Sequence, residues 1–154
     1  MGVAEKFGKV SLRRENRILA VQWIYMCEST RQRALLEQFF AICALFEKDP
    51  EQFEYAKTIV GLIQKHLGEI DTLINRFATN WNFARIATVD LSILRLATCE
   101  LLYRNDIPPI VTINEAIEIS KMFSGELSKG FINGVLDRVK GTLSRSLRTA
   151  SVSA

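Results

Sequence analysis

The chain has 154 residues and a formal net charge of +3, and its 48% apolar and 24% charged residues are typical of one globular domain. Its uncharged apolar runs are too short to cross a bilayer, and its first ten residues lack the apolar core of a signal peptide. Three cysteines lie at no metal-ligand spacing, which suits a reducing compartment. We therefore predict one cytoplasmic domain over residues 1–154, with no membrane association.

The first predicted helix follows Ser11, a candidate N-cap. Its apolar residues between 18 and 25 surround the helix axis, the pattern of a helix buried in a core. Arg13, Arg14 and Arg17 occupy its first turns, where the positive end of the helix dipole makes cations unfavourable. The same end is a ready anion site, so these arginines predict contact with a phosphate-bearing partner, or else merely solvated charges.

The next helices follow from their apolar periodicity. One face is apolar over residues 31–47, and Asp49-Pro50 indicates a new helix start. The apolar stripe that follows runs from residue 53 to residue 67, and Gly68 is its expected end. The remaining helices are expected within residues 70–77, 80–103, 112–123 and 132–143.

Two helix starts in the second half carry polar signals. Thr112 and Glu115 fit the capping-box pattern T-x-x-E. A break near Thr88 puts Asp90 in a first turn, where a negative charge is favourable. The alternative for Asp90 is an exposed acid beside an apolar patch, able to receive a basic partner.

Helical periodicity almost everywhere predicts an all-α fold of about seven helices with short connections. The ends, residues 1–10 and 149–154, are expected to be flexible. Residues 1–17 hold five basic against two acidic residues, and residues 121–154 hold six against two. If both ends fold onto one face, the domain carries a basic patch; otherwise they are two solvated termini.

The sequence offers little for catalysis. His66 is the single histidine, and there is no nucleotide-binding glycine loop, nucleophile elbow or zinc spacing. Carboxylates such as Glu100 and Glu115 can form an acid–base pair, although such residues more often cap helices or pair with arginines such as Arg85 and Arg95. We predict a protein that is not an enzyme, with no catalytic residue, no metal and no cofactor.

The segment SGELSKGFING near the end suggests a close approach to the backbone. Gly130 and Gly134 are one helical turn apart and share a face, on which either another helix or a ligand can approach. We expect another helix of the core there; Lys121, Lys129 and Phe131 provide the alternative of a ligand, because single-stranded nucleic acid needs charge for its phosphates and rings for stacking.

Three segments, in this order, resemble the transcription antitermination factor NusB family. They are RRENRILAVQWIY from residue 13, NWNFARIATVDLSILRLATCELL from residue 80, and IPPIVTINEAIEISKMF with KGFINGVLD after it, from residues 107 and 129. The resemblance implies two small helical bundles packed across each other. It further implies a non-enzymatic factor that binds boxA of nascent ribosomal RNA transcripts together with NusE, a small-subunit ribosomal protein. The pair acts on the RNA polymerase elongation complex to suppress termination.

The resemblance also implies the binding residues. The expected RNA-binding set is Lys6, Lys9, Arg13, Arg14, Arg17, Gln22, Lys121, Lys129, Gly130, Phe131 and Asn133. Tyr25 and Asp90 match positions that face NusE, and Leu127 stands where some members carry an acid. Some relatives self-associate, which leaves a homodimer open. Two alternatives remain: an RNA-binding partner of a ribosomal-RNA-modifying enzyme, or a helical protein-interaction module.

Overall fold

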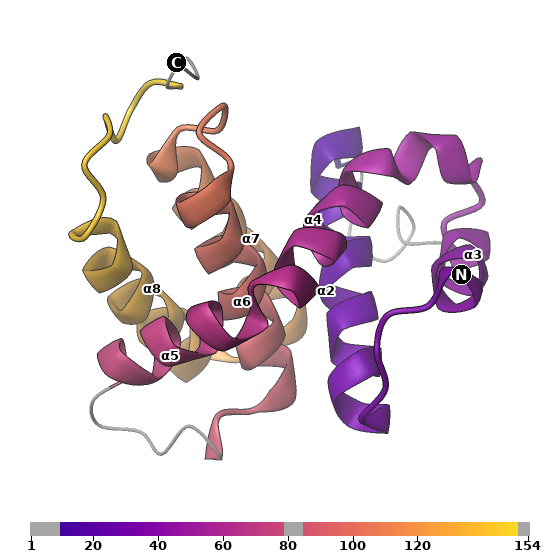
Figure 1. Cartoon of the computed structure of the whole chain (residues 1–154), viewed down its shortest axis with the longest axis horizontal. Helices are drawn as coiled ribbons and strands as arrows, with labels where there is room; N and C mark the ends of the chain where they lie inside the picture. The colour runs from indigo at the N-terminus through magenta and orange to yellow at the C-terminus, as the bar shows by residue number, and fades with distance from the viewer. Residues whose placement is uncertain (1–9, 79–84, 151–154) are drawn as a thin grey trace.

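A computed structural model describes residues 10–78 and 85–150, which form seven α-helices and one short 3-10 helix (Figure 1). The expectations for Lys6, Lys9 and the outermost ends of the chain lie outside these residues. The helices are α2 Leu12–Thr30, α3 Leu36–Leu45, α4 Glu54–Lys65, α5 Leu67–Phe77, α6 Thr88–Tyr103, α7 Pro109–Phe123 and α8 Glu126–Lys140, with the 3-10 helix η1 at Pro50–Phe53. The all-α prediction is confirmed.

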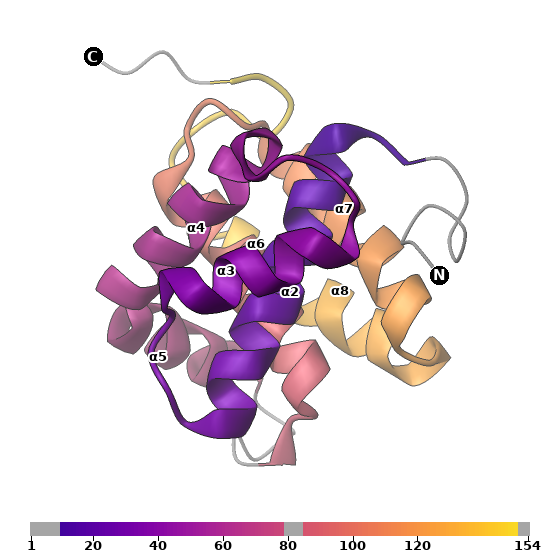
Figure 2. The same cartoon turned by 90° about the vertical axis from the view of Figure 1, so that its right-hand side faces the viewer.

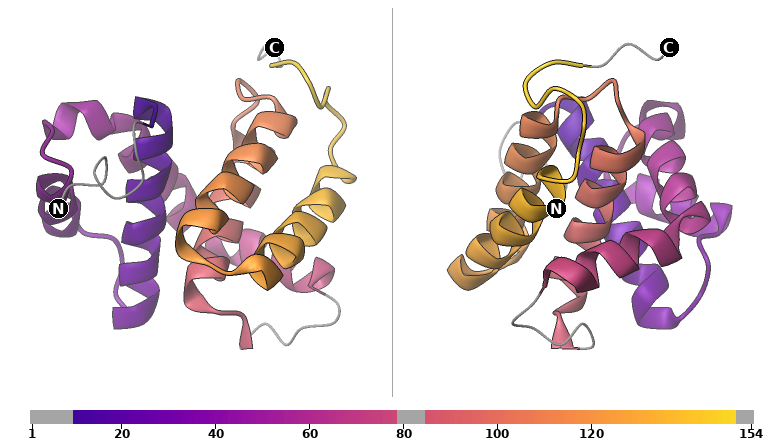
Figure 3. Two further views of the ribbon diagram at one scale, coloured as in Figure 1. Left: turned by 180° about the vertical axis from the view of Figure 1, so that it is seen from behind. Right: turned by 60° about the vertical axis from the view of Figure 1, so that its left-hand side comes forward.

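The helices form two groups around α6. On one side α2 packs against α3 and α4, and on the other side α5, α7 and α8 pack against α6 (Figure 1). Seen from behind, α2 and α3 stand beside the pair of α7 and α8 (Figure 3). All residues of α6 from Asp90 to Leu101 are buried, because its apolar side chains face neighbours all round. The contact of α2 and α4 with α6 joins the two groups across the core.

The start of α2 matches its sequence signals. Ser11 is the N-cap, and its side chain accepts a hydrogen bond from the backbone N–H of Arg14 at 3.1 Å. The helix ends at Thr30, and the residue after it, Arg31, has a left-handed φ of 54°. Between these ends Ile18, Leu19 and Ala20 are fully buried, so the prediction of a buried helix is confirmed.

Two predicted helix ends are wrong. Gly68 does not end α4, because the chain bends at His66 and α5 begins at once at Leu67. The capping box is also wrong, since α7 begins three residues before Thr112, with Pro109 in its first turn. The Thr112 and Glu115 side chains are instead used in contacts with other helices.

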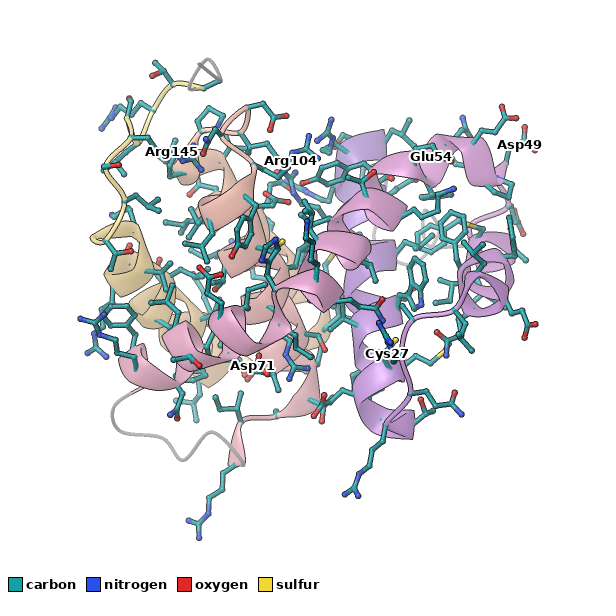
Figure 4. The ribbon with its side chains drawn as sticks, viewed as in Figure 1. Cys27, Asp49, Glu54, Asp71, Arg104 and Arg145 are labelled. Atoms are coloured by element: carbon teal, nitrogen blue, oxygen red, sulfur yellow. The ribbon has the colours of Figure 1, made fainter. Side chains whose placement is uncertain are left out.

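The residues after α8 fold back over the end of α6. Arg145 donates hydrogen bonds to the carbonyl oxygens of Ile107 at 2.8 Å and Leu101 at 3.1 Å, and it lies at the same end of the molecule as Arg104 (Figure 4). The Leu147 carbonyl accepts from the Ile110 N–H at 3.0 Å, which fixes the start of α7. Among the described residues no helix is both long and apolar enough to span a membrane.

Candidate nucleic-acid interface

The three arginines at the start of α2 have three different environments. Arg17 is only 4% exposed, and its Nε and Nη2 donate to Glu100 at 2.8 and 3.1 Å. Arg14 is half-buried, and its Nε and Nη2 donate to Glu115 at 2.8 and 2.9 Å. Arg13 is exposed, with its guanidinium carbon 4.0 Å from the centroid of the Tyr55 ring. Two of the three positive charges are therefore neutralised within the fold.

Glu100 is the acceptor at the centre of this arrangement. It is 1% exposed and accepts from Arg17, from the Tyr55 hydroxyl at 2.6 Å and from the Thr112 hydroxyl at 2.8 Å. Burial pushes the pKa of Arg17 down, but the hydrogen bonds and charge of Glu100 outweigh it, so the pKa lies above its ordinary value. One carboxylate thus ties the start of α2 to α4, α6 and α7.

The sequence pointed to Glu100 and Glu115 only as acids that often pair with arginines. Their partners are Arg17 and Arg14, whereas Arg95 pairs with Glu28 and Asp71. An acid inside the apolar stretch of α6 does require a buried partner, which is a usable signal. Nothing in the sequence identifies that partner, which lies 83 residues away. Tyr55 was missed altogether, since a single tyrosine in a helix is ordinary.

Basic residues from the two ends of the chain meet around Glu118 on α7. The Lys121 ammonium donates to Glu118 at 2.9 Å, and this hydrogen bond lowers the pKa of Glu118. The charges of Arg14 and Lys129 lower it further, and Arg14 is held one turn away on α7 by its hydrogen bonds to Glu115. Figure 2 shows the same order, with α7 between the start of α2 and α8. We call Arg14, Lys121 and Lys129 the basic face.

Arg14 from the start of the chain and Lys121 from its last third thus lie along one side of α7, and the role of this face in binding RNA stays a prediction. The other C-terminal cations take different positions. Arg138 donates to the Phe77 carbonyl at 2.6 Å at the end of α5, and Arg145 binds carbonyls at the end of α6. The basic patch is therefore smaller than the six basic residues of segment 121–154 suggested.

The glycines of α8 have open surroundings. A Cβ placed on Gly130 or Gly134 would meet no atom within 4 Å, so no helix approaches their backbone in the described residues. Both Lys129 and Gly130 lie within α8 rather than in a loop. Phe131 and Asn133 are half-buried, and Phe131 packs against the core. The expected helix is therefore not found at this face among the described residues, and a ligand remains as the alternative.

Asp90 is in the first turn of α6, as predicted, but the expectation of an exposed acid is wrong. It is 6% exposed and accepts hydrogen bonds from the hydroxyls of Ser124 and Ser128, both at 2.8 Å. Ser124 and Ser128 lie where α7 meets α8, so this junction covers the Asp90 carboxylate. Its expected contact with NusE stays a prediction.

Tyr25 is 46% exposed and borders an apolar hollow of about 190 Å³. The hollow is lined by Val21, Gln22, Tyr25, Val89 and Phe123. The side-chain oxygen of Gln22 is buried and has no hydrogen-bond partner among the described residues. Gln22 and Tyr25, predicted to bind RNA and NusE, thus share one apolar surface beside the start of α6.

Comparison with known proteins decides the family. The model of the NusB family matches residues 14–140. The chain belongs to the NusB family. It is 40% identical over 132 residues to transcription antitermination protein NusB of Myxococcus xanthus, covering 86% of this chain and 94% of the relative. With the NusB of Geobacter sulfurreducens it shares 45% identity over 136 residues, covering 85% and 95%. NusB-family membership makes the chain a non-enzymatic transcription antitermination factor.

Solved structures agree on the NusB fold. A structure of T. maritima NusB superposes with a TM-score of 0.75 at 34% identity, covering 89% of this chain and 95% of that one. Antitermination factor NusB, solved with NusE in complex with double-stranded RNA, superposes with a TM-score of 0.77 at 24% identity, covering 86% and 98%. The second likeness concerns the fold alone. The predicted NusB-like architecture is confirmed.

Proposed function

We propose that the chain binds boxA of nascent ribosomal RNA leader transcripts together with NusE, and that this complex helps RNA polymerase resist termination. The observation that carries the RNA part is that Arg14 and Lys121 bind Glu115 and Glu118, one turn apart on α7, while the charge of Lys129 also acts on Glu118. Phosphate-led binding needs several cations on one face, and these cations come from three helices that the core holds together. Family membership favours this RNA over other anions.

Each part of the predicted RNA-binding set has a distinct task in this proposal. Lys121 and Lys129 supply point charges to phosphates, and Arg14 supplies the Nη1 group that its bond to Glu115 leaves over. For the half-buried ring of Phe131, next to the open backbone of Gly130, we propose stacking against a base. For Arg17 we propose a structural task, since Glu100 holds its fork inside the protein.

The NusE part rests on the hollow beside Tyr25. Partly exposed aromatic rings beside apolar depressions are typical anchors of protein interfaces. Asp90 is buried, so we propose that it supports the NusE-binding surface indirectly, by accepting hydrogen bonds that hold Ser124 and Ser128 in place. One fold neighbour was solved with NusE and double-stranded RNA, which agrees with this pairing of ligands. We expect the protein to act in the cytoplasm, where nascent transcripts are made; a homodimer stays a prediction, testable by sedimentation.

Titration of labelled boxA RNA, with and without NusE and at several salt concentrations, tests the proposal. We expect boxA to bind more tightly than a scrambled RNA of equal length, and NusE to strengthen boxA binding. Roughly three to five phosphate contacts predict a slope of log K against log salt of about −2 to −3.5, at about −0.7 for each phosphate. Equal affinity for both RNAs, or a flat salt profile, would contradict the proposal and favour a protein-interaction module.

A further inference from the structure

Among the arginines at the start of α2, Arg13 is the one that forms no ion pair within 4 Å in the described residues, although its charge helps to lower the pKa of Asp106. Its side chain is exposed, yet its guanidinium lies 4.0 Å from the Tyr55 ring centroid, well within the range of cation–π attraction. By contrast, two nitrogens of Arg14 donate to Glu115, and two nitrogens of Arg17 donate to Glu100. Arg13 therefore combines hydrogen-bond donors facing solvent with a fixed position.

The Tyr55 ring is itself held in place from several sides. Its hydroxyl donates to Glu100 at 2.6 Å, and a second guanidinium, that of Arg104, lies 4.9 Å from the ring centroid. Arg104 is fixed in turn by Asp106, which accepts from its Nε at 2.8 Å and its Nη2 at 2.7 Å. Burial keeps the pKa of the Tyr55 hydroxyl far above its usual range, so it remains a neutral donor to Glu100.

We propose that Tyr55 is a positioning residue for RNA binding: its ring holds Arg13 in place to donate to a phosphate of single-stranded RNA that continues past the basic face. This inference rests on the proposed function. A free surface arginine loses rotamer freedom when it binds, and a ring that already restrains it reduces that loss. The forked guanidinium suits a phosphate, and stacking on Tyr55 leaves its edge donors available.

Two substitutions of Tyr55 separate its ring from its hydroxyl. Tyr55→Phe and Tyr55→Leu both lose the hydrogen bond to Glu100, so both share that loss of stability, but only the leucine variant loses the ring. We expect Tyr55→Leu to weaken boxA binding by about three- to fivefold, the range for an exposed cation–π contact, and Tyr55→Phe to bind like the parent. Arg13→Ala should lower the salt slope by about 0.7. Circular dichroism selects a temperature at which every variant is folded.

A double-mutant cycle gives the decisive readout. With Arg13→Ala already present, Tyr55→Leu should cause no further loss of RNA affinity, because the ring acts through Arg13. Equal losses in both backgrounds, or equal losses for the phenylalanine and leucine variants, would overturn the positioning role. RNA binding by the parent protein distinguishes failure of the Tyr55 proposal from failure of the proposed function. If the parent binds boxA no better than scrambled RNA, the proposed function fails, but the double-mutant cycle can still be measured with either RNA to test the role of Tyr55. If it binds neither RNA, both proposals fail.

Discussion

Replacing Arg17 by alanine should destabilise the protein far more than replacing Arg14, although the two residues are neighbours on one helix. The Arg17 and Glu100 side chains are 5% and 1% exposed, so the truncated variant leaves a carboxylate charge buried without its cation. Breaking a buried ion pair in this way costs about 3–5 kcal/mol. The side chains of Arg14 and Glu115 are 27% and 19% exposed, and solvent screening reduces the cost of Arg14→Ala to about 0–1 kcal/mol.

These free energies translate into separable melting temperatures. In a domain of this size about 1 kcal/mol shifts Tm by roughly 2–4 °C, so we expect Arg17→Ala to lower Tm by roughly 6–20 °C and Arg14→Ala by no more than about 4 °C. Thermal unfolding followed by circular dichroism at neutral pH measures both variants. RNA titration of the same samples should show the opposite order, with Arg14→Ala losing affinity while its Tm stays close to that of the parent.

A double replacement, Arg17→Met with Glu100→Gln, controls for the missing charge. Removing both partners leaves no uncompensated carboxylate, so this variant should melt above Arg17→Ala. If Arg17→Ala instead melts as close to the parent as Arg14→Ala does, the argument from burial is refuted. The pair would then be too well hydrated to matter for stability, and Arg17 would return as a candidate for RNA contact.

Three further predictions test other parts of the structure. Tyr25→Ser should weaken NusE association in a calorimetric titration while leaving RNA affinity and Tm near the parent values; parallel loss of Tm would mean that the ring supports the fold. Glu115→Gln should strengthen boxA binding a few-fold, because the carboxylate that competes with phosphate for Arg14 is gone; weaker binding would show that Glu115 positions Arg14 instead. Burial raises the pKa of the Cys99 thiol to about 12, so the folded state keeps a proton that the unfolded state releases above about pH 9, and stability should fall as pH rises from there. Cys99→Ala should flatten this fall, and an unchanged pH profile would contradict the assignment.

The sequence predicted the helices because each depends on neighbouring residues. The Ser11 cap, the Asp49-Pro50 start that opens η1 and the apolar residues all round α2 are local patterns, and each appears in the structure. Predictions failed where a side chain has a choice of partners. Thr112 matches a local capping pattern but bonds to Glu100, and Asp90 matches an exposed acid but accepts from two serines.

The site was harder to predict than the fold for the same reason. Arg14 and Arg17 have the same residue type, lie in adjacent turns and resemble one family motif, yet one is half-buried and the other buried. What separates them is which carboxylate faces each one, and those carboxylates lie 101 and 83 residues away. A contact over such a distance leaves no trace in one sequence. The family resemblance predicted both arginines as one RNA-binding set, whereas the structure separates the buried Arg17 from the partly exposed Arg14.

The positive end of a helix should be a poor place for three arginines, and the structure explains how the fold tolerates them. Glu100 and Glu115, from α6 and α7, bring negative charge to the start of α2, so the dipole and the arginines are compensated together. Because these acids belong to helices of the other group, the contact between the two groups also builds the basic face. A variant that loosens this contact should therefore lose RNA affinity and stability together, whereas a variant at the exposed Arg13 should lose affinity alone.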